Sequence, residues 1–108
     1  MGGAARRLAR LGGVAVKLRW MRRALDDMRR CAQEIALISP RAAVEVVDRL
    51  IETAEALRDA RGAGRPIGRG LLELRIAGSR LALVYRRNEA AQRLEILHIA
   101  QAEEAWGR

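Results

Sequence analysis

Two stretches in the first half of the chain repeat their apolar residues at helical spacing. The first runs from Arg22 to about Leu37, and its stripe consists of Leu25, Met28, Ala32 and Ile35. The second runs from Pro40 to about Ala60, and its stripe consists of Ala43, Val47, Leu50, Ile51, Ala54 and Leu57. A recurrence every three or four residues places these side chains on one face of a helix. The sequence therefore predicts two amphipathic helices.

A Ser-Pro pair separates these two helices. Ser39 can cap the second helix with its hydroxyl oxygen, and Pro40 suits the first helical position, where its missing N–H costs nothing. Gly62 and Gly64 end the second helix. Since the junction at Ser39 is short, we expect the helices to form a helical hairpin.

Strand-like segments flank the helical hairpin. Ala15–Trp20 precedes it and contains β-branched and aromatic residues. Leu71–Ile76 follows it, and Gly78-Ser79 then suits a two-residue turn with Gly at its first central position. A third strand of the resulting meander, Arg93–Ile99, comes after a polar connection.

The turn fixes the expected register of the first hairpin. It pairs Ala77 with Arg80, Ile76 with Leu81, Leu74 with Leu83 and Leu72 with Tyr85. The apolar residues then share one face, and Glu73, Arg75, Arg80 and Arg86 share the other. A slip of one residue would destroy this match, so the register is well specified. We expect Glu73 to orient Arg75 or Arg86 by a cross-strand pair.

These elements predict an α+β fold of order β-α-α-β-β-β. A short strand and a helical hairpin precede a three-stranded antiparallel β-meander, with the helices on one sheet face. Residues 14–108 are expected to form one domain. Residues 1–13 are basic, lack periodicity and end in Gly-Gly, which predicts a flexible extension or an over-long start assignment. The alternative is that residues 1–13 form an arm that binds nucleic acid.

Positive charge is concentrated in one segment. The formal net charge is +8, and residues 61–87 contribute +6 of it through seven Arg against the single acid Glu73. Lys17 is the only lysine among 21 basic residues. Arginine stays protonated at ordinary pH and offers forked donors. Focused charge of this kind favours acidic or polyanionic partners. The alternative is a solvated basic surface that has no dedicated partner.

Composition argues against several other functions. With one cysteine and one histidine, Cys31 and His98, the chain has neither an intrachain disulfide nor a cysteine-cluster metal site, and we expect no metal or cofactor. The three aromatic residues are Trp20, Tyr85 and Trp106, so the chain has few rings on which nucleic-acid bases could stack. No apolar run approaches the ~20 residues that span a bilayer, and we expect a cytoplasmic protein.

Proton-transfer groups are also scarce. A ribonuclease needs one group to activate the 2′-hydroxyl and another to protonate the leaving oxygen. The register directs Tyr85 into the core, and His98 alternates with Leu94 and Ile96, which favours a hydrogen-bonded core histidine. Arginine does not deprotonate. If the protein were a nuclease, His98 and Arg75 would be its candidate catalytic residues.

Several short segments form a further pattern through their order and spacing across residues 15–106. They are Leu18-Arg-Trp20, Ala24-Leu-Asp-Asp27, Ser39-Pro40, Gly64-Arg-Pro66, Gly70-Leu-Leu-Glu-Leu-Arg75, Val84-Tyr-Arg86 and Ile96-Leu-His98. Together they resemble the RelE/ParE family of bacterial type II toxin–antitoxin toxins. His98-x-x-Gln101 with a nearby Trp106 is similar to the ParE branch, known as inhibitors of DNA gyrase. In that branch the aromatic residue usually follows the Gln sooner than it does here.

This resemblance implies a gyrase-inhibiting toxin without its own catalysis, held in a hetero-oligomer by a cognate antitoxin. The alternatives are a ribosome-dependent mRNA endonuclease and a degenerate homologue that binds the antitoxin but is no longer toxic. The residues expected to bind the acidic C-terminal segment of the antitoxin, or the target, are Arg65, Arg69, Glu73, Arg75, Arg80, Arg86, Gln101 and Trp106. Arg75 is the first choice, because its mid-strand position fixes its direction.

Overall fold

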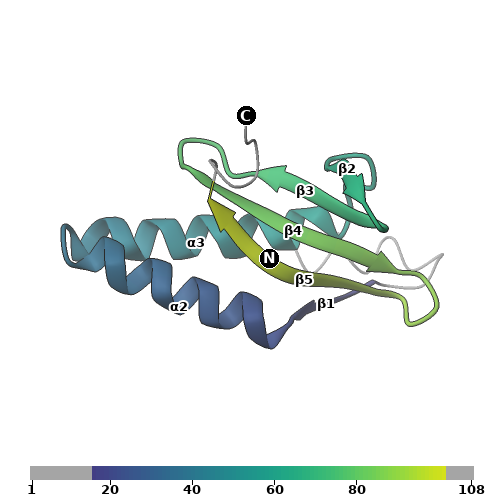
Figure 1. Ribbon diagram of the computed structural model, residues 1–108, viewed down its shortest axis with the longest axis horizontal. Helices are drawn as coiled ribbons and strands as arrows, with labels where there is room; N and C mark the ends of the chain where they lie inside the picture. Colours follow the sequence, from purple (N-terminus) through teal and green to yellow (C-terminus); the bar gives the residue numbers. More distant parts are fainter. Residues whose placement is uncertain (1–15, 102–108) are drawn as a thin grey trace, which may run out of the picture.

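The computed structural model describes residues 16–101, which form two helices and one five-stranded sheet. In chain order the elements are β1 (Lys17–Trp20), α2 (Arg22–Ala36), α3 (Pro40–Leu57), β2 (Arg65–Gly68), β3 (Leu71–Arg75), β4 (Leu81–Asn88) and β5 (Arg93–Gln101). The strand order in the sheet is β1-β5-β4-β3-β2. The helical hairpin forms one layer and the sheet the other (Figure 1). The predicted α+β class is confirmed, while the predicted extension 1–13 lies outside the described residues.

The junction between the helices follows the sequence prediction. Ser39 has an extended backbone, and its side-chain oxygen accepts a hydrogen bond of 3.1 Å from the Ala42 N–H. Pro40 occupies the start of α3. Helix α3 ends at Leu57, short of the expected Ala60. There the Arg87 guanidinium donates to the carbonyl oxygens of Leu57 and Ala60, at 2.7 and 3.2 Å. These bonds add to those that the same oxygens accept from the Ala60 and Ala63 N–H groups.

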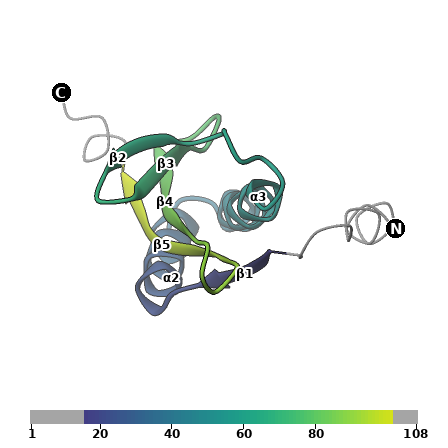
Figure 2. The same ribbon diagram turned by 90° about the vertical axis from the view of Figure 1, so that its right-hand side faces the viewer.

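Strand β1 pairs only with the first half of β5. The pairing is parallel and runs from Lys17 opposite Arg93 to Trp20 opposite Ile96. The Met21 N–H then donates to the Ile96 carbonyl oxygen at 2.9 Å, and the chain enters α2. Beyond Ile96, the outer edge of β5 is therefore bordered by α2 instead of β1, as Figure 2 shows from the end of the strands.

The β3–β4 hairpin has the predicted register but a different turn. Leu72 pairs with Tyr85 and Leu74 with Leu83, as expected. The predicted turn at Gly78-Ser79 is wrong, because the Ser79 N–H donates to the Ile76 carbonyl oxygen at 3.2 Å. Gly78 is thus the second central residue, and its φ of 76° is one that glycine adopts without steric cost. The Ile76 N–H still donates to the Leu81 carbonyl oxygen at 2.8 Å.

The sheet contains one strand that the sequence pattern did not predict. Residues Arg65–Gly68 were expected to be a loop, but they pair antiparallel with β3, Arg65 opposite Glu73 and Pro66 opposite Leu72. Strand β2 lies at the sheet edge, where a proline is tolerated because one side of the strand needs no ladder hydrogen bonds. The order of elements is therefore β-α-α-β-β-β-β.

The core lies between α3, the start of α2 and the inner sheet face. Its buried members are Ala24, Leu50, Ala54, Leu57, Ile76, Leu81, Leu83, Tyr85, Leu94, Ile96 and Ile99. The helical stripe contributes Leu50, Ala54 and Leu57, which are almost fully buried. No helix within residues 16–101 is long and apolar enough to cross a membrane.

Gly64 leaves room for the buried ring of Tyr85. The tyrosine is fully buried, and a Cβ added to Gly64 would collide with its hydroxyl oxygen and ring. A Cβ added to Gly62, two residues earlier, would meet no atom within 4 Å. Tyr85 is therefore a core residue, as predicted, and the chain can pass over it only with glycine at position 64.

We predict that Gly64→Ala lowers the free energy of unfolding by about 1–3 kcal/mol, the usual cost of overpacking. Gly62→Ala is the matched control and should change it by less than about 0.5 kcal/mol. Urea unfolding of both variants, followed by circular dichroism, measures the difference. Combining Gly64→Ala with Tyr85→Phe should recover part of the loss, since the phenol oxygen makes the closest contact. Equal stability of the two glycine variants would refute this packing.

Candidate functional site

The sheet face opposite the core carries most of the charged residues of the sheet, and we call it the charged face. Residues paired across neighbouring strands share a face, so the register assigns its members. They are Lys17, Arg19, Arg65, Glu73, Arg75, Arg86, Asn88, Arg93, Glu95 and His98. Basic residues dominate this set, and its carboxylates are buried beneath them.

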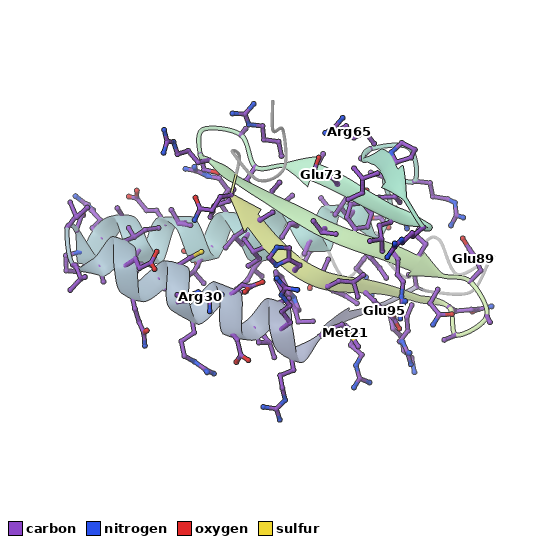
Figure 3. The ribbon with its side chains drawn as sticks, viewed as in Figure 1. Met21, Arg30, Arg65, Glu73, Glu89 and Glu95 are labelled. Atoms are coloured by element: carbon purple, nitrogen blue, oxygen red, sulfur yellow. The ribbon has the colours of Figure 1, made fainter. Side chains whose placement is uncertain are left out.

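Glu73 joins β2 to the rest of the charged face. Its side chain is 3% exposed. Glu73 Oε1 accepts a hydrogen bond from Arg65 Nε at 3.1 Å and lies 3.0 Å from Arg65 Nη2 in an ion pair. Figure 3 shows the two residues close together on the neighbouring strands β2 and β3. Glu73 was expected to orient Arg75 or Arg86. The Arg65 pairing was missed because β2 itself was expected to be a loop.

Glu95 is the centre of a second, denser cluster. Its side chain is 1% exposed, and Arg86 Nε donates to Oε1 at 2.6 Å. Arg93 donates to Oε2 through Nε at 2.9 Å and Nη2 at 2.6 Å, and Asn88 Nδ2 lies 3.4 Å from the same oxygen. The hydrogen bonds from Arg86 and then Arg93 lower the pKa of Glu95 to about 2, against the effect of burial.

Glu95 is not among the residues that the sequence pattern predicted for the site. A usable signal was present, since Glu95 stands between Leu94 and Ile96 in an apolar strand. A charged residue in that position must face away from the core or be paired. Its partner Arg86 lies directly opposite it on the neighbouring strand β4. The sequence does not predict this pairing, because the connection between β4 and β5 contains no specific turn motif that would set the register.

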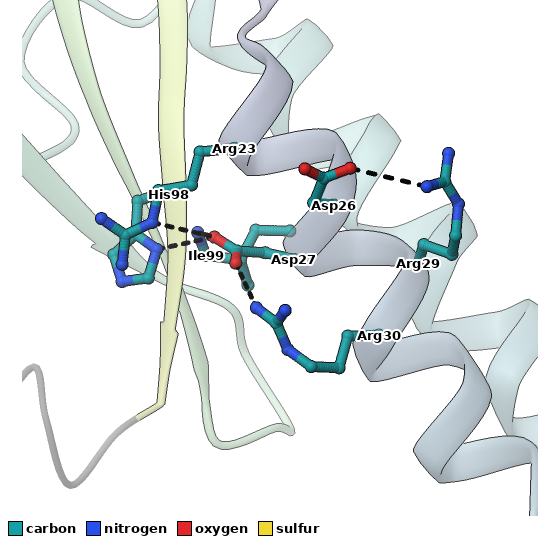
Figure 4. Close-up of polar contacts among 7 residues, drawn as sticks. All are labelled: Arg23, Asp26, Asp27, Arg29, Arg30, His98 and Ile99. Carbon is teal, nitrogen blue, oxygen red and sulfur yellow. Dashed lines mark hydrogen bonds and ion pairs between the residues drawn. The ribbon is translucent and has the colours of Figure 1, made fainter.

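Asp27 fixes helix α2 to the open edge of β5. The residue is 3% exposed, and its Oδ2 accepts the Ile99 N–H at 3.0 Å and lies 2.6 Å from His98 Nδ1. Arg30, one turn further along α2, donates to Oδ1 at 2.5 Å (Figure 4). Burial acts to raise the pKa of Asp27, but the Ile99 and His98 hydrogen bonds and the Arg30 charge lower it overall.

His98 does not lie where the alternation of β5 placed it. Tyr85 pairs with Ile96 and Val84 with His98, so Leu97 is an extra residue in a bulge. The bulge turns His98 away from the face of Ile96 and onto the charged face. The ring is hydrogen-bonded, as expected, but its side chain is 25% exposed, so the prediction of a core position was wrong. An Asp–His pair of this form can orient an imidazole for proton transfer.

The other residues predicted for the site lie in different places. Arg69 is in the β2–β3 turn with a φ of 59°, and Arg75 and Arg80 are exposed at the β3–β4 end. Gln101 pairs with Leu81 on the core side and lines a pocket of about 240 Å³ between the helical hairpin and the β3–β4 turn, together with Arg80. Trp106 lies outside the described residues. Within residues 16–101, no three histidine, cysteine or acidic side chains lie close enough together to hold a metal ion.

Comparison with known proteins gives a consistent result. A family model described as ParE toxin of type II toxin-antitoxin system, parDE, matches residues 18–106. The chain is similar to a structure of the chromosomal ParDE toxin–antitoxin system from P. aeruginosa, with 26% identity, a TM-score of 0.74 and coverage of 82% of this chain and 98% of that chain. No curated protein matches the sequence significantly.

Two RelE-type structures are similar in fold. One is the RelBE2 toxin–antitoxin complex from Mycobacterium tuberculosis, with 22% identity, a TM-score of 0.56 and coverage of 82% of this chain and 92% of that chain. The other is the isolated E. coli RelE toxin, with 18% identity, a TM-score of 0.54 and coverage of 82% and 86%.

The fold is that of RelE/ParE-type toxins. Because the family model covers most of the sequence, the chain belongs to the ParE toxin family of type II toxin–antitoxin systems. The resemblance inferred from the short sequence segments is therefore confirmed.

We predict that Asp27→Asn lowers the free energy of unfolding by about 2 kcal/mol, because it weakens the hydrogen bonds that the buried carboxylate makes with Ile99, His98 and Arg30. Asp26→Asn is the matched control, because Asp26 is half exposed and lies 3.5 Å from Arg29. Such surface pairs contribute about 0–1 kcal/mol. Chemical unfolding at pH 7 compares the two variants. Similar losses for both would show that Asp27 does not anchor α2.

Glu95 should make stability depend on acid pH. Its pKa is about 2 in the folded state against an ordinary value of 4.5, so its ionised form stabilises the fold. That contribution is complete above about pH 4.5 and is lost as the pH falls toward 2. We predict that wild type is more stable than Glu95→Gln at pH 7 and that the difference shrinks over this interval. A difference in urea midpoints that stays constant from pH 7 to pH 2.5 would contradict the assignment.

Proposed function

We propose that this ParE-family chain inhibits DNA gyrase by binding it, without catalysis of its own, and that a cognate antitoxin neutralises it in a hetero-oligomer. The observation that carries this proposal is the family match over residues 18–106. The similarity to the ParDE system from P. aeruginosa, at 26% identity, supports it.

The chemistry of the charged face favours a binding role. Its cations are arginines apart from Lys17, and arginine cannot serve as a general base. Arg86 and Arg93 hold Glu95 ionised. Near neutral pH it therefore carries no proton to donate and is a weak proton acceptor. The Tyr85 hydroxyl is buried in the core. This face can therefore bind and stabilise negative charge, but it supplies few groups that exchange protons.

A ribosome-dependent mRNA endonuclease is the second candidate, and one contact favours it. His98 lies on the charged face, with Nδ1 2.6 Å from the buried Asp27. A carboxylate that fixes one ring nitrogen leaves the other able to act in general acid–base catalysis. His98 is the only described group of this kind on the face, so the two candidate functions can be separated through it.

The deciding experiment uses purified full-length chain and two reactions. We expect inhibition of gyrase supercoiling, or trapping of gyrase on cleaved DNA, with no ribosome present. We expect mRNA on translating ribosomes to remain uncut. His98→Gln should leave the gyrase effect largely intact in the folded fraction, because the proposal assigns His98 no chemistry. Cleavage of mRNA that disappears in this folded variant, without any effect on gyrase, would establish the nuclease instead.

The antitoxin is proposed to cover two surfaces. Leu37, Ile38 and Val44 at the tip of the helical hairpin are 87%, 89% and 61% exposed, and a patch of this kind marks a partner site in a soluble protein. An acidic segment would then lie near Arg75 and Arg80, within the segment that holds most of the net charge. A disordered segment that folds on binding can span both surfaces.

We predict that Arg75→Glu combined with Arg80→Glu weakens antitoxin binding and reduces its salt dependence. The partner would be the small acidic protein expected to be encoded beside this chain, and titration calorimetry at several salt concentrations would measure the affinity. Lys17→Glu with Arg61→Glu removes equal charge at the other end of the sheet and should have a smaller effect. Unchanged affinity of the first pair at low salt would refute the acidic contact.

A further inference from the structure

A basic cluster at one end of the charged face was not anticipated from the charge distribution along the sequence. It combines residues from three neighbouring strands: Lys17 and Arg19 of β1, Arg93 and Glu95 of β5, and Arg86 and Asn88 of β4. The register arranges them in two rows, one of Arg19, Glu95 and Arg86 and the other of Lys17, Arg93 and Asn88. We call these six residues the three-strand cluster.

The cluster is strongly positive at its surface. Its four cations surround one carboxylate, and that carboxylate is almost completely buried. The Arg86 and Arg93 side chains are 48% and 34% exposed, and Lys17 and Arg19 are exposed residues. Among residues 16–101, the Lys17 and Arg19 side chains make no hydrogen bond or ion pair. The cluster therefore presents positive charge to solvent with its only negative charge underneath.

Glu95 gives this surface a fixed geometry. It binds Nε of both Arg86 and Arg93 and Nη2 of Arg93, which restrains both guanidinium groups while leaving other N–H groups available. Residues two apart on a strand are about 6.6–6.8 Å apart, and adjacent strands are about 4.8 Å apart. The cations thus form a flat array about 10 Å wide. Restrained arginines lose less conformational freedom when they bind an anion.

The chemistry of the array fits a phosphodiester backbone better than an acidic peptide. All its members are polar or charged, whereas the cores of protein–protein interfaces are depleted of charge. The large exposed apolar residues of the described chain lie elsewhere, five on the helical hairpin and Ile67 on β2. Protein–DNA interfaces, by contrast, are polar and strongly positive.

The array also fits a duplex better than a single strand. Single-stranded nucleic acid is usually held by aromatic rings that stack on its bases. The two aromatic residues within residues 16–101 are Tyr85 and Trp20, and both pack into the core from the opposite sheet face. Duplex DNA carries one charge per ~1.7 Å of its axis, so an array about 10 Å wide meets several phosphates at once.

We propose that the three-strand cluster binds the phosphate backbone of double-stranded DNA without reading its sequence. The choice of DNA over duplex RNA rests on the proposed gyrase function, since gyrase acts on DNA. On this account the toxin contacts gyrase and the DNA that gyrase holds, and the cluster is its DNA-facing surface.

The test measures binding of full-length protein to a fluorescently labelled 20-base-pair DNA duplex by anisotropy, over a range of salt concentrations. Each phosphate contact adds about 0.9 to the slope of log affinity against log salt. Lys17→Gln with Arg19→Gln should therefore lower that slope by nearly 2 and weaken binding at low salt by at least about tenfold. The control, Arg29→Gln with Arg41→Gln, removes equal charge from exposed positions on the helices and should change both values much less.

Two further probes decide the ligand. Duplex RNA and single-stranded DNA of the same length should bind no more tightly than duplex DNA. The affinity for a polyglutamate peptide should not change when Lys17 and Arg19 are replaced. Equal losses in the two variant pairs, or tighter cluster-dependent binding of any other probe, would overturn the proposal. DNA binding is measured without gyrase. Cluster-dependent DNA binding by a chain that leaves gyrase unaffected would therefore refute the proposed function and leave this inference standing.

Discussion

Three buried carboxylates, each bound by cationic side chains, hold this fold together. Asp27, Glu73 and Glu95 are at most 3% exposed in a chain with 21 basic and 13 acidic residues. An ionised carboxylate taken out of water must be compensated by hydrogen bonds and opposite charge. Each of the three therefore fixes a junction between elements: Asp27 joins α2 to β5, Glu73 joins β3 to β2, and Glu95 joins β5 to β4.

This arrangement also explains how a sheet can carry so many arginines. Like charges on adjacent strands repel each other, and the buried carboxylates offset part of that repulsion from below. The outward N–H groups remain available to a partner. The same groups that stabilise the fold thus prepare a rigid, permanently charged surface, which suits recognition of anions better than proton transfer.

The sequence predicted the elements whose signals are local. Apolar spacing located both helices, the Ser39-Pro40 pair located their junction, and the alternation of apolar residues set the β3–β4 register. These features depend on residues close together in the chain. The resemblance between short segments and the RelE/ParE family then identified the fold that unites them.

Features that depend on contacts between distant residues were not predicted. Strand β2 contains Pro66 and Gly68 and forms only because β3 offers it an edge. The bulge at Leu97 moves His98 to the other sheet face, and alternation alone could not reveal it. Glu95 and the three-strand cluster require the pairing of β1, β5 and β4, which no local motif encodes. Among the residues predicted for the site, Arg65, Glu73, Arg75 and Arg86 lie on the charged face, whereas Lys17, Arg19, Arg93 and Glu95 were not predicted.

The pKa of Glu95 tests the role of the buried carboxylates most directly. It can be measured from the side-chain carboxyl ¹³C chemical shift of full-length protein during an acid titration, with Glu95→Gln assigning the resonance. We expect a midpoint at about 2, because Arg86 and Arg93 hold the carboxylate ionised. A midpoint near the ordinary value of 4.5 would show that the arginines do not bind it in solution and would contradict the account.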